Sequence, residues 1–363
     1  MITSIIIFLA TCNTIFSFPL DKIVMFFFVF YCIYKYKINK KMLLLILGLL
    51  CFLFLIYTIN VFIKNNVSLL LFFPIIGVLF VYYISKYYTI QILKRALCIH
   101  FVVAIFFLIR AYLTRDDLNA HFLYDKGLPF LAAPMGYTAT VQTFGTLLLS
   151  YIILSFSQEK NNHFLLFFVF VLFFSTFNRA SYGNLLIFIV LNNPLLLIFI
   201  LLFIIVLFVI LPKIMISLLG TFNTIASRIE ALLEANSAIL GASIFNFFLG
   251  HSNTLISGNE NINVIENGIM QLLFTYGFIF YAALLCCFLI WICFIKTNTK
   301  FLNKIYIFYI IIFAQIFTHE YFSTTLYIIL SSLFLVNQKI LKLSLKPSKR
   351  LLLFTKCNCV NTG

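Results

Sequence analysis

Two arginines in this chain occupy positions where a cation is costly unless it binds an anion. Arg179 lies in STFNRASYGN between two apolar stretches; it is either a functional residue or a loop side chain that reaches lipid phosphates. Arg228 lies in SRIEALLEANSAIL, where Ser227 and Glu230 match a capping box. The match predicts Arg228 as the first residue of a helix, beside amides that favour an anion, or else as a solvated arginine paired with a glutamate.

A third candidate is the polar segment SGNENINVIENG, residues 257–268, which directly precedes a long apolar run. Unpaired amides cost several kcal/mol in lipid, so this segment must be solvated or line a solvated cavity. We interpret it as the lip of an active site.

Two further groups of polar residues are ambiguous. Arg115, with Arg110 and two aspartates, is either functional or part of an ion-paired loop mouth. His319 and Glu320 lie between two apolar runs with almost no loop to solvate them, so they face a wet cavity or anchor an interface. His100 lies within an apolar run and is expected to be a core group rather than a catalyst.

Signatures of soluble enzymes are missing from the sequence. It contains no Walker loop, GxGxxG, HExxH or GxSxG motif, so ATP-driven and nicotinamide chemistry have no support. The nine cysteines are scattered, and Cys357 with Cys359 offers too few ligands for zinc. We expect no cofactor, no structural metal and no disulfide.

The elements that must position these residues are apolar helices. The chain has 363 residues, 47 phenylalanines and a mean hydropathy of +1.11, and runs of about 20 apolar residues recur along it. This predicts an all-α polytopic membrane domain over residues 1–338 and a basic cytoplasmic tail over 339–363. The expected spans, about twelve, are 3–19, 22–36, 42–63, 67–85, 96–113, 136–157, 163–177, 181–193, 195–212, 268–295, 304–318 and 322–337.

The net charge of +15 fits a membrane orientation better than nucleic-acid binding. With the N-terminus inside, most of the 25 basic residues fall in cytoplasmic loops and the tail. Every acidic residue except Glu159 falls on the outer side or in the outer ends of spans. The stretch 164–193 could be one long helix or two short ones. The charge distribution favours two, because a single helix would place the lysines at 296–304 outside.

Two long loops, 113–136 and 213–267, then lie on the outer side. The second contains a predicted amphipathic helix, 227–240, and the apolar piece FNFFLG (245–250), which is typical of a re-entrant or interfacial segment. The apolar residues assigned to one face of that helix are Ile229, Leu232, Leu233, Ile239 and Leu240. An enzyme with an external site needs such a loop, whereas a simple helix bundle does not.

In this layout the chain resembles the O-antigen polymerases (Wzy), within the wider family of O-antigen ligases and polysaccharide polymerases. The resemblance rests on about twelve spans, the arginine in STFNRAS, and a late outer loop with Arg228 and FFLGHS. The loop leads into ENGIMQLLFTYGFIFYAAL, which has a glycine further in. Family members often carry His-Asn where this chain has Glu266 and Asn267.

The resemblance implies a GT-C-like all-α fold and chemistry at the periplasmic face of a bacterial inner membrane. A glycan on undecaprenyl diphosphate is transferred to a newly flipped lipid-linked repeat unit, and undecaprenyl diphosphate leaves. The implied partners are these oligosaccharides, membrane lipid and a chain-length regulator protein, with no nucleic acid and no metal.

The resemblance also assigns roles. Arg179 and Arg228 would stabilise the diphosphate leaving group, because guanidinium binds its oxygens bidentately. Glu266 is the favoured base for the acceptor hydroxyl, with His251 as the alternative. The expected substrate-binding residues are Arg115, His319 and Asn267.

Three rival functions stay open. An O-antigen ligase would use nearly the same site on a different acceptor. A lipid-linked oligosaccharide flippase would need two comparable halves around a cationic cavity. A structural partner protein would explain neither Arg179 nor the 213–267 loop.

Overall fold

The computed structural model describes most of the helical part of the chain. The described residues are 1–12, 19–36, 44, 47–48, 50–55, 57–58, 72–115, 119–123, 128–138, 140–156, 162–192, 222–251, 267–294, 301–316, 318, 321 and 323–344. The expected span 195–212 therefore lies outside them, as does most of 42–63.

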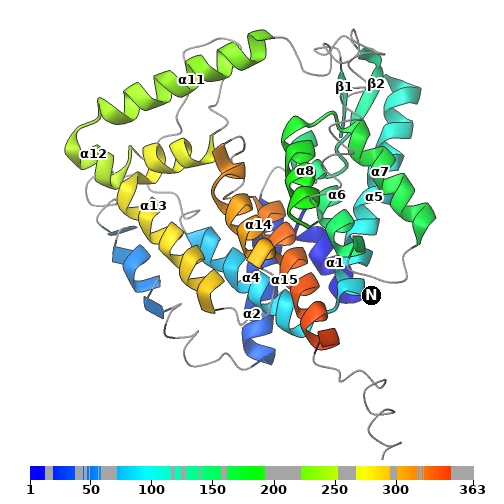
Figure 1. The fold of residues 1–363 in the computed structure, drawn as a ribbon, viewed down its shortest axis with the longest axis horizontal. Helices are drawn as coiled ribbons and strands as arrows, with labels where there is room; N and C mark the ends of the chain where they lie inside the picture. Colours follow the sequence, from blue (N-terminus) through cyan, green and yellow to red (C-terminus); the bar gives the residue numbers. More distant parts are fainter. Residues whose placement is uncertain are drawn as a thin grey trace, which may run out of the picture.

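Helices dominate the described residues (Figure 1). The first half of the chain contains α1 (Ile2–Leu9), α2 (Leu20–Lys35), α4 (Phe73–Tyr87), α5 (Ile90–Thr114), α6 (Val141–Phe156), α7 (His163–Ser175) and α8 (Arg179–Asn192). The second half contains α11 (Phe222–Leu240), α12 (Ile244–Leu249), α13 (Gly268–Phe294), α14 (Phe301–Ile311), the 3₁₀ turn η3 (Ala314–Ile316) and α15 (Thr324–Ser344). Because α15 continues to Ser344, the expected start of the tail at residue 339 falls within a helix.

A small sheet departs from the expected all-helical fold. β1 (Ala120–Leu123) pairs antiparallel with β2 (Leu128–Pro134), with Ala120 opposite Pro134. The hairpin follows the end of α5, where the Ala132 N–H donates to the Tyr112 hydroxyl at 3.0 Å. The stretch 113–136, predicted as an outer loop, therefore contains regular structure that hydropathy alone did not predict.

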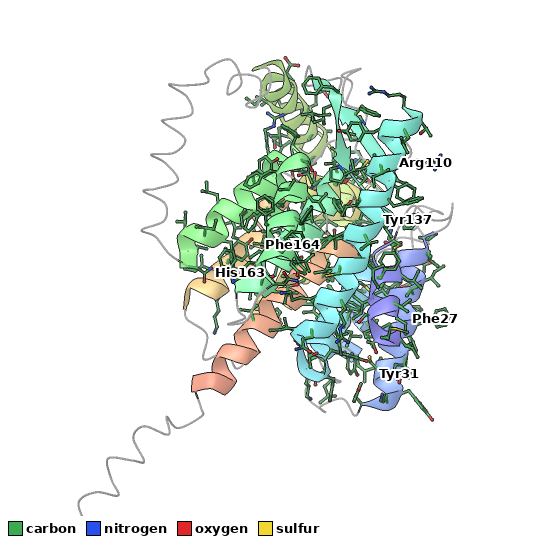
Figure 2. All side chains as sticks on the ribbon, turned by 90° about the vertical axis from the view of Figure 1, so that its right-hand side faces the viewer. Phe27, Tyr31, Arg110, Tyr137, His163 and Phe164 are labelled. Carbon is green, nitrogen blue, oxygen red and sulfur yellow. The ribbon has the colours of Figure 1, made fainter. Side chains whose placement is uncertain are left out.

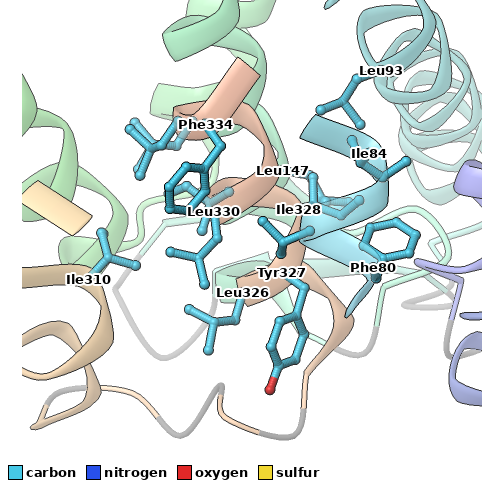
Figure 3. Close-up of a cluster of buried hydrophobic side chains, with 14 of the residues drawn as sticks. Phe80, Ile84, Leu93, Leu147, Ile310, Leu326, Tyr327, Ile328, Leu330 and Phe334 are labelled. Carbon is cyan, nitrogen blue, oxygen red and sulfur yellow. The ribbon is translucent and has the colours of Figure 1, made fainter. Parts of the chain in front are cut away.

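The core is centred on α15, which packs between α4 and α6 (Figure 3). Tyr327 lies directly over Gly77 of α4, where any Cβ would overlap its ring. The Tyr327 hydroxyl donates to the Tyr321 carbonyl at 2.9 Å. Glycine at this position therefore lets two helices approach closely around a buried aromatic ring.

Two described helices are long and apolar enough to cross a membrane: α5, and α13 over Gly268–Cys286. Shorter apolar helices of 10–17 residues are Phe73–Tyr87, Val141–Phe156, His163–Ser175, Lys304–Ile316 and Thr324–Val336. These helices coincide with expected spans, although most are shorter than the hydropathy pattern predicted.

Several helices carry large apolar side chains on their outward faces. On α2, Phe27 and Tyr31 point away from the ribbon (Figure 2). The corresponding exposed residues of α7 are Phe164, Phe167, Phe168, Val171 and Phe174. Exposed aromatic surface on this scale is unusual for a protein surrounded by water.

The stretch 164–193 forms two helices, as the charge distribution predicted. α7 ends at Ser175 and α8 begins at Arg179, with Phe177 between them in the left-handed region at φ 48°. The lysines that follow can therefore lie on the same side as the earlier basic loops.

Candidate functional site

The turn between α7 and α8 places Arg179 at the start of a helix. The Asn178 side-chain oxygen accepts from the Ser181 N–H at 3.2 Å, and its carbonyl accepts from the Tyr182 N–H at 3.1 Å. Asn178 is therefore the N-cap, and Arg179 is the first helical residue. Arg179 is also exposed. An arginine here lies at the positive end of the helix dipole, which favours an anion beside it.

The α7–α8 turn lies at the hairpin end of the helix bundle. Ser181 and Thr176 both face Gly145, which lies one turn into α6 after the chain leaves β2. The Thr176 hydroxyl donates to the Phe173 carbonyl at 2.7 Å, and the Tyr182 hydroxyl donates to the Phe174 carbonyl. Side chains within the turn thus satisfy the carbonyls left free where α7 ends.

The structure corrects the predicted start of the helix containing Arg228. α11 begins at Phe222, so Ser227 is not its N-cap and Arg228 is not its first residue. The S-x-x-E pattern was misleading because serine and glutamate also occur within helices, and no helix-breaking residue precedes Ser227. The feature predicted for Arg228, an arginine at a helix start, is found at Arg179.

The face of α11 that packs against α13 is lined by small residues. From residue 229 onward, where its side chains are described, the buried residues are Ala231, Ala235 and Ile239, which follow one another at helical spacing. Ala231 and Ala235 pack near Met270 and Phe274 of α13. Ile229, Leu233 and Leu240, which were assigned to the apolar face of this helix, are exposed. The small alanine face packs against α13 because it permits close approach, which the larger side chains would prevent.

α13 is not one straight span. Gly277 has φ 82° and ψ 170°, a conformation that interrupts the helix. Its first half runs across the molecule and the remainder descends (Figure 1). Gly250, at the end of α12, has φ 78° and lies against this break, where a Cβ on either glycine would overlap backbone atoms of the other segment.

His251 is held at the break in α13. Its backbone N–H donates to the Phe274 carbonyl at 2.6 Å, and its ring stacks on Phe274 with centroids 4.1 Å apart. Ring Nδ1 lies 3.3 Å from the same carbonyl. Since a carbonyl can only accept, Nδ1 carries the hydrogen in this contact, which leaves Nε2 as the basic nitrogen of a neutral ring.

Asn267 forms the N-cap of α13. It is buried, and its side-chain oxygen accepts from the Met270 N–H at 3.0 Å. The adjacent Gly268 N–H donates to the Thr318 carbonyl at 2.7 Å. This bond ties the start of α13 to Thr318. The predicted residue His319 lies outside the described residues.

Tyr321, three residues before α15, is bonded to the end of α14. The Tyr321 hydroxyl donates to the Ile311 carbonyl at 2.6 Å. Burial raises the pKa of this hydroxyl well above its usual range, so Tyr321 remains a neutral donor.

Arg115 has a contact that accounts for it without a substrate. It is the residue after α5, in the left-handed conformation, and its guanidinium carbon lies 5.8 Å from the centroid of the Phe122 ring. This cation–π contact holds the hairpin against the end of α5. Substrate binding by Arg115 stays a prediction.

A buried carboxylate was missed by the sequence analysis. Asp21, at the start of α2, is 3% exposed, and burial raises its pKa despite the Lys22 charge and the neighbouring Thr324 hydroxyl. The signal was available, because Asp21 follows Pro19 between two apolar runs with too short a loop to solvate it. His100, in contrast, is buried against Thr11 and Phe8, as expected for a core group.

The predicted residues that the structure describes belong to two groups of elements, the hairpin with the α7–α8 turn and the unit of α11, α12 and α13 (Figure 1). Arg115 and Arg179 lie on the hairpin side. The backbones of Arg228, His251 and Asn267 belong to the unit formed by α11, α12 and α13. Glu266 and His319 lie outside the described residues. Within the described part of the chain, no three His, Cys, Asp or Glu side chains meet as metal ligands would.

Comparisons with protein families, with curated proteins and with solved structures found no match to this chain.

Proposed function

We propose that this chain is a polymerase of lipid-linked oligosaccharides, acting at the outer face of a bacterial inner membrane. The observation that carries the proposal is the interrupted apolar helix at 176–178, which leaves the exposed Arg179 at a helix N-terminus. The helix N-terminus favours an anion at that position, and the guanidinium can bind a diphosphate there bidentately.

Placement in a bilayer is supported by the outward faces of the helices. α7 exposes phenylalanines along its length, and α5 exposes Val102, Phe106, Ile109 and Leu113. Acyl chains can cover such surfaces without the free-energy penalty that water imposes. In this placement about twelve spans cross the inner membrane, and the loop 213–267 is periplasmic.

The leaving group would be stabilised by arginine. As the glycosidic bond to undecaprenyl diphosphate breaks, negative charge grows on the phosphate oxygens. Arg179 and the first amides of α8 would stabilise this charge, which is commonly the largest catalytic contribution. Arg228 would assist from the second turn of α11, and Asn267 and His319 would bind the sugars.

The base would take the proton from the acceptor hydroxyl. His251 is suited to this role because its Nδ1 contact fixes the ring and leaves Nε2 available to accept the proton. Glu266, one residue before the N-cap Asn267, is the other candidate for the base.

Deleting the gene tests the proposal against its rivals. Loss of a polymerase leaves lipopolysaccharide core capped by a single repeat unit, which a gel resolves as one band above bare core. Bare core alone would instead indicate a ligase or a flippase, and an unchanged ladder would contradict all three functions.

The orientation can be tested separately with reporter fusions. A fusion at Asn259 should be active only in the periplasm, and one at Asn298 only in the cytoplasm. If Asn259 proved accessible from the cytoplasm alone, the external active site would be excluded.

A further inference from the structure

The junction between α11 and α12 presents an apolar edge, formed by Leu240, Ile244, Phe245 and Phe248. Leu240 is 71% exposed and Ile244 is 79% exposed, and both phenylalanines are more than two-fifths exposed. Residues 240–250 contain no charged side chain. The acidic residues of α11, Glu230 and Glu234, occur only further back along the helix.

The apolar edge is fixed to α13 rather than to a loop. Phe247 stacks on Phe278 with ring centroids 5.8 Å apart, and Phe248 meets the same ring edge-on at 6.3 Å. The close approach of Gly250 to Gly277 joins the two backbones at this point. α12 therefore has a fixed position along the axis of the descending half of α13.

The surface next to the apolar edge is the outer end of a candidate span. Phe278 is itself exposed and begins the descending half of α13, residues 278–294. At 1.5 Å per residue these 17 residues extend about 25 Å, close to the thickness of the bilayer hydrocarbon. α12 lies at the margin of the molecule, beside the upper end of this half (Figure 1). Its exposed phenylalanines thus continue the apolar face of the span.

We propose that the apolar edge is embedded in the outer leaflet of the bilayer, so that α12 anchors His251 at the boundary between lipid and water. His251 follows Gly250 directly and is bonded to Phe274. It therefore lies at about the same depth relative to the bilayer as α12. The inference rests on the proposed placement in a bilayer, but it does not depend on the polymerase chemistry.

Tryptophan quenching in lipid vesicles tests this anchor. The chain has a single tryptophan, Trp291, so a Trp291→Phe background is silent. Into it are placed Phe245→Trp or Phe248→Trp, with Ser237→Trp on the exposed polar side of α11 as the matched control. Phe167→Trp on α7 reports separately on placement in the bilayer. The quenchers are phospholipids brominated near the headgroup and aqueous iodide.

The anchor predicts that tryptophan at 245 and 248 loses most of its emission to brominated lipid and little to iodide, with the reverse at 237. Quenching of 245 and 248 by iodide alone, while 167 responds to lipid, would overturn the anchor but leave the bilayer placement intact. Lipid quenching absent at all three sites, 245, 248 and 167, would overturn both. Protection of 245 and 248 from both quenchers would indicate a protein partner, such as a second copy, and would also overturn the anchor.

Discussion

Among the described residues, the break between α7 and α8 and the break within α13 are built differently. Between α7 and α8 the residue with positive φ is Phe177, and nearby side chains satisfy the backbone: Asn178 caps α8, while Thr176 and Tyr182 bond to carbonyls of α7. In α13 the residue is Gly277, and a separate segment ending in Gly250 and His251 packs into the break.

The difference shows what each break can do. The α7–α8 break is stabilised mainly by its own side chains. What it exposes is the N-terminus of α8 with Arg179. The α13 break holds another segment, so it can fix a side chain from outside the helix, His251, at a set position. Within the proposed function, the first break supplies the cation and the second positions the base.

The largest change in stability is expected at the α13 break. Gly277→Ala would place a Cβ against the Phe248 carbonyl in a backbone region nearly restricted to glycine. The conformation alone costs about 1–3 kcal/mol, and the overlap adds to it. The melting temperature in detergent should fall strongly, and α12 should detach.

The matched control for this variant is Gly183→Ala. Gly183 lies within α8 with no heavy atom within 4 Å of an added Cβ, so alanine there should be neutral or stabilising by up to about 1 kcal/mol. Equal melting temperatures for the two variants would contradict the described junction.

The next effect concerns catalysis at His251. His251→Asn keeps a donor in the place of Nδ1 but removes the basic Nε2, whereas His251→Ala removes both. If His251 is the base, both variants should lose roughly 10²–10⁴-fold in the polymerisation rate of purified enzyme. Recovery by asparagine would show that the ring only stabilises the junction, and the base would then be sought at Glu266 with Glu266→Gln.

A smaller effect is expected from the cap of α8. Asn178→Ala leaves the Ser181 N–H without its side-chain acceptor and should destabilise the helix start by about 1 kcal/mol. Asn178→Ser should keep most of the stability that Asn178→Ala loses, since serine is also a good N-cap. The measurement is the melting temperature, and a serine variant no better than alanine would argue against the cap.

The smallest effect is expected at Phe177. Phe177→Gly relieves a left-handed conformation that costs about 1–2 kcal/mol, and it adds glycine entropy of about 0.5–1 kcal/mol, so these two terms leave a stabilisation of about 0–1.5 kcal/mol. This tolerance would contrast with Gly277→Ala. A large fall in melting temperature would mean that the Phe177 ring itself is needed for packing.

Hydropathy and charge predicted much of the fold, because they report on burial and on orientation. The two-helix form of 164–193 followed from where the lysines fall, and α5, α6 and α15 coincide with expected spans. Hydropathy and charge did not predict local backbone geometry, such as the break within α13. The break at Gly277 depends on Gly250, which lies 27 residues earlier in the chain and contacts it only after folding.

The functional roles of the candidate site residues stay predictions, and the structure adds only their local geometry. Arg179 was identified because a cation between apolar runs is rare, and the structure adds its position at a helix start. The predicted start of α11 was wrong, because a capping pattern at Ser227 does not exclude helical turns before it. The position of Asp21 between two apolar runs indicated burial, but its neighbour Thr324, some 300 residues later in the chain, could not be inferred from the sequence.

The most direct measurement is the length distribution of surface polysaccharide made by Arg179 variants at matched protein levels. The control is Arg95→Lys. Arg95 is exposed near the start of α5, at the end of that helix away from the hairpin. We expect Arg179→Ala and Arg179→Lys both to collapse the ladder to single repeats, since lysine keeps the charge but loses the bidentate contact to diphosphate. The Arg95 variant should make a normal ladder. A normal ladder from both Arg179 variants would contradict the proposed role of the α7–α8 break.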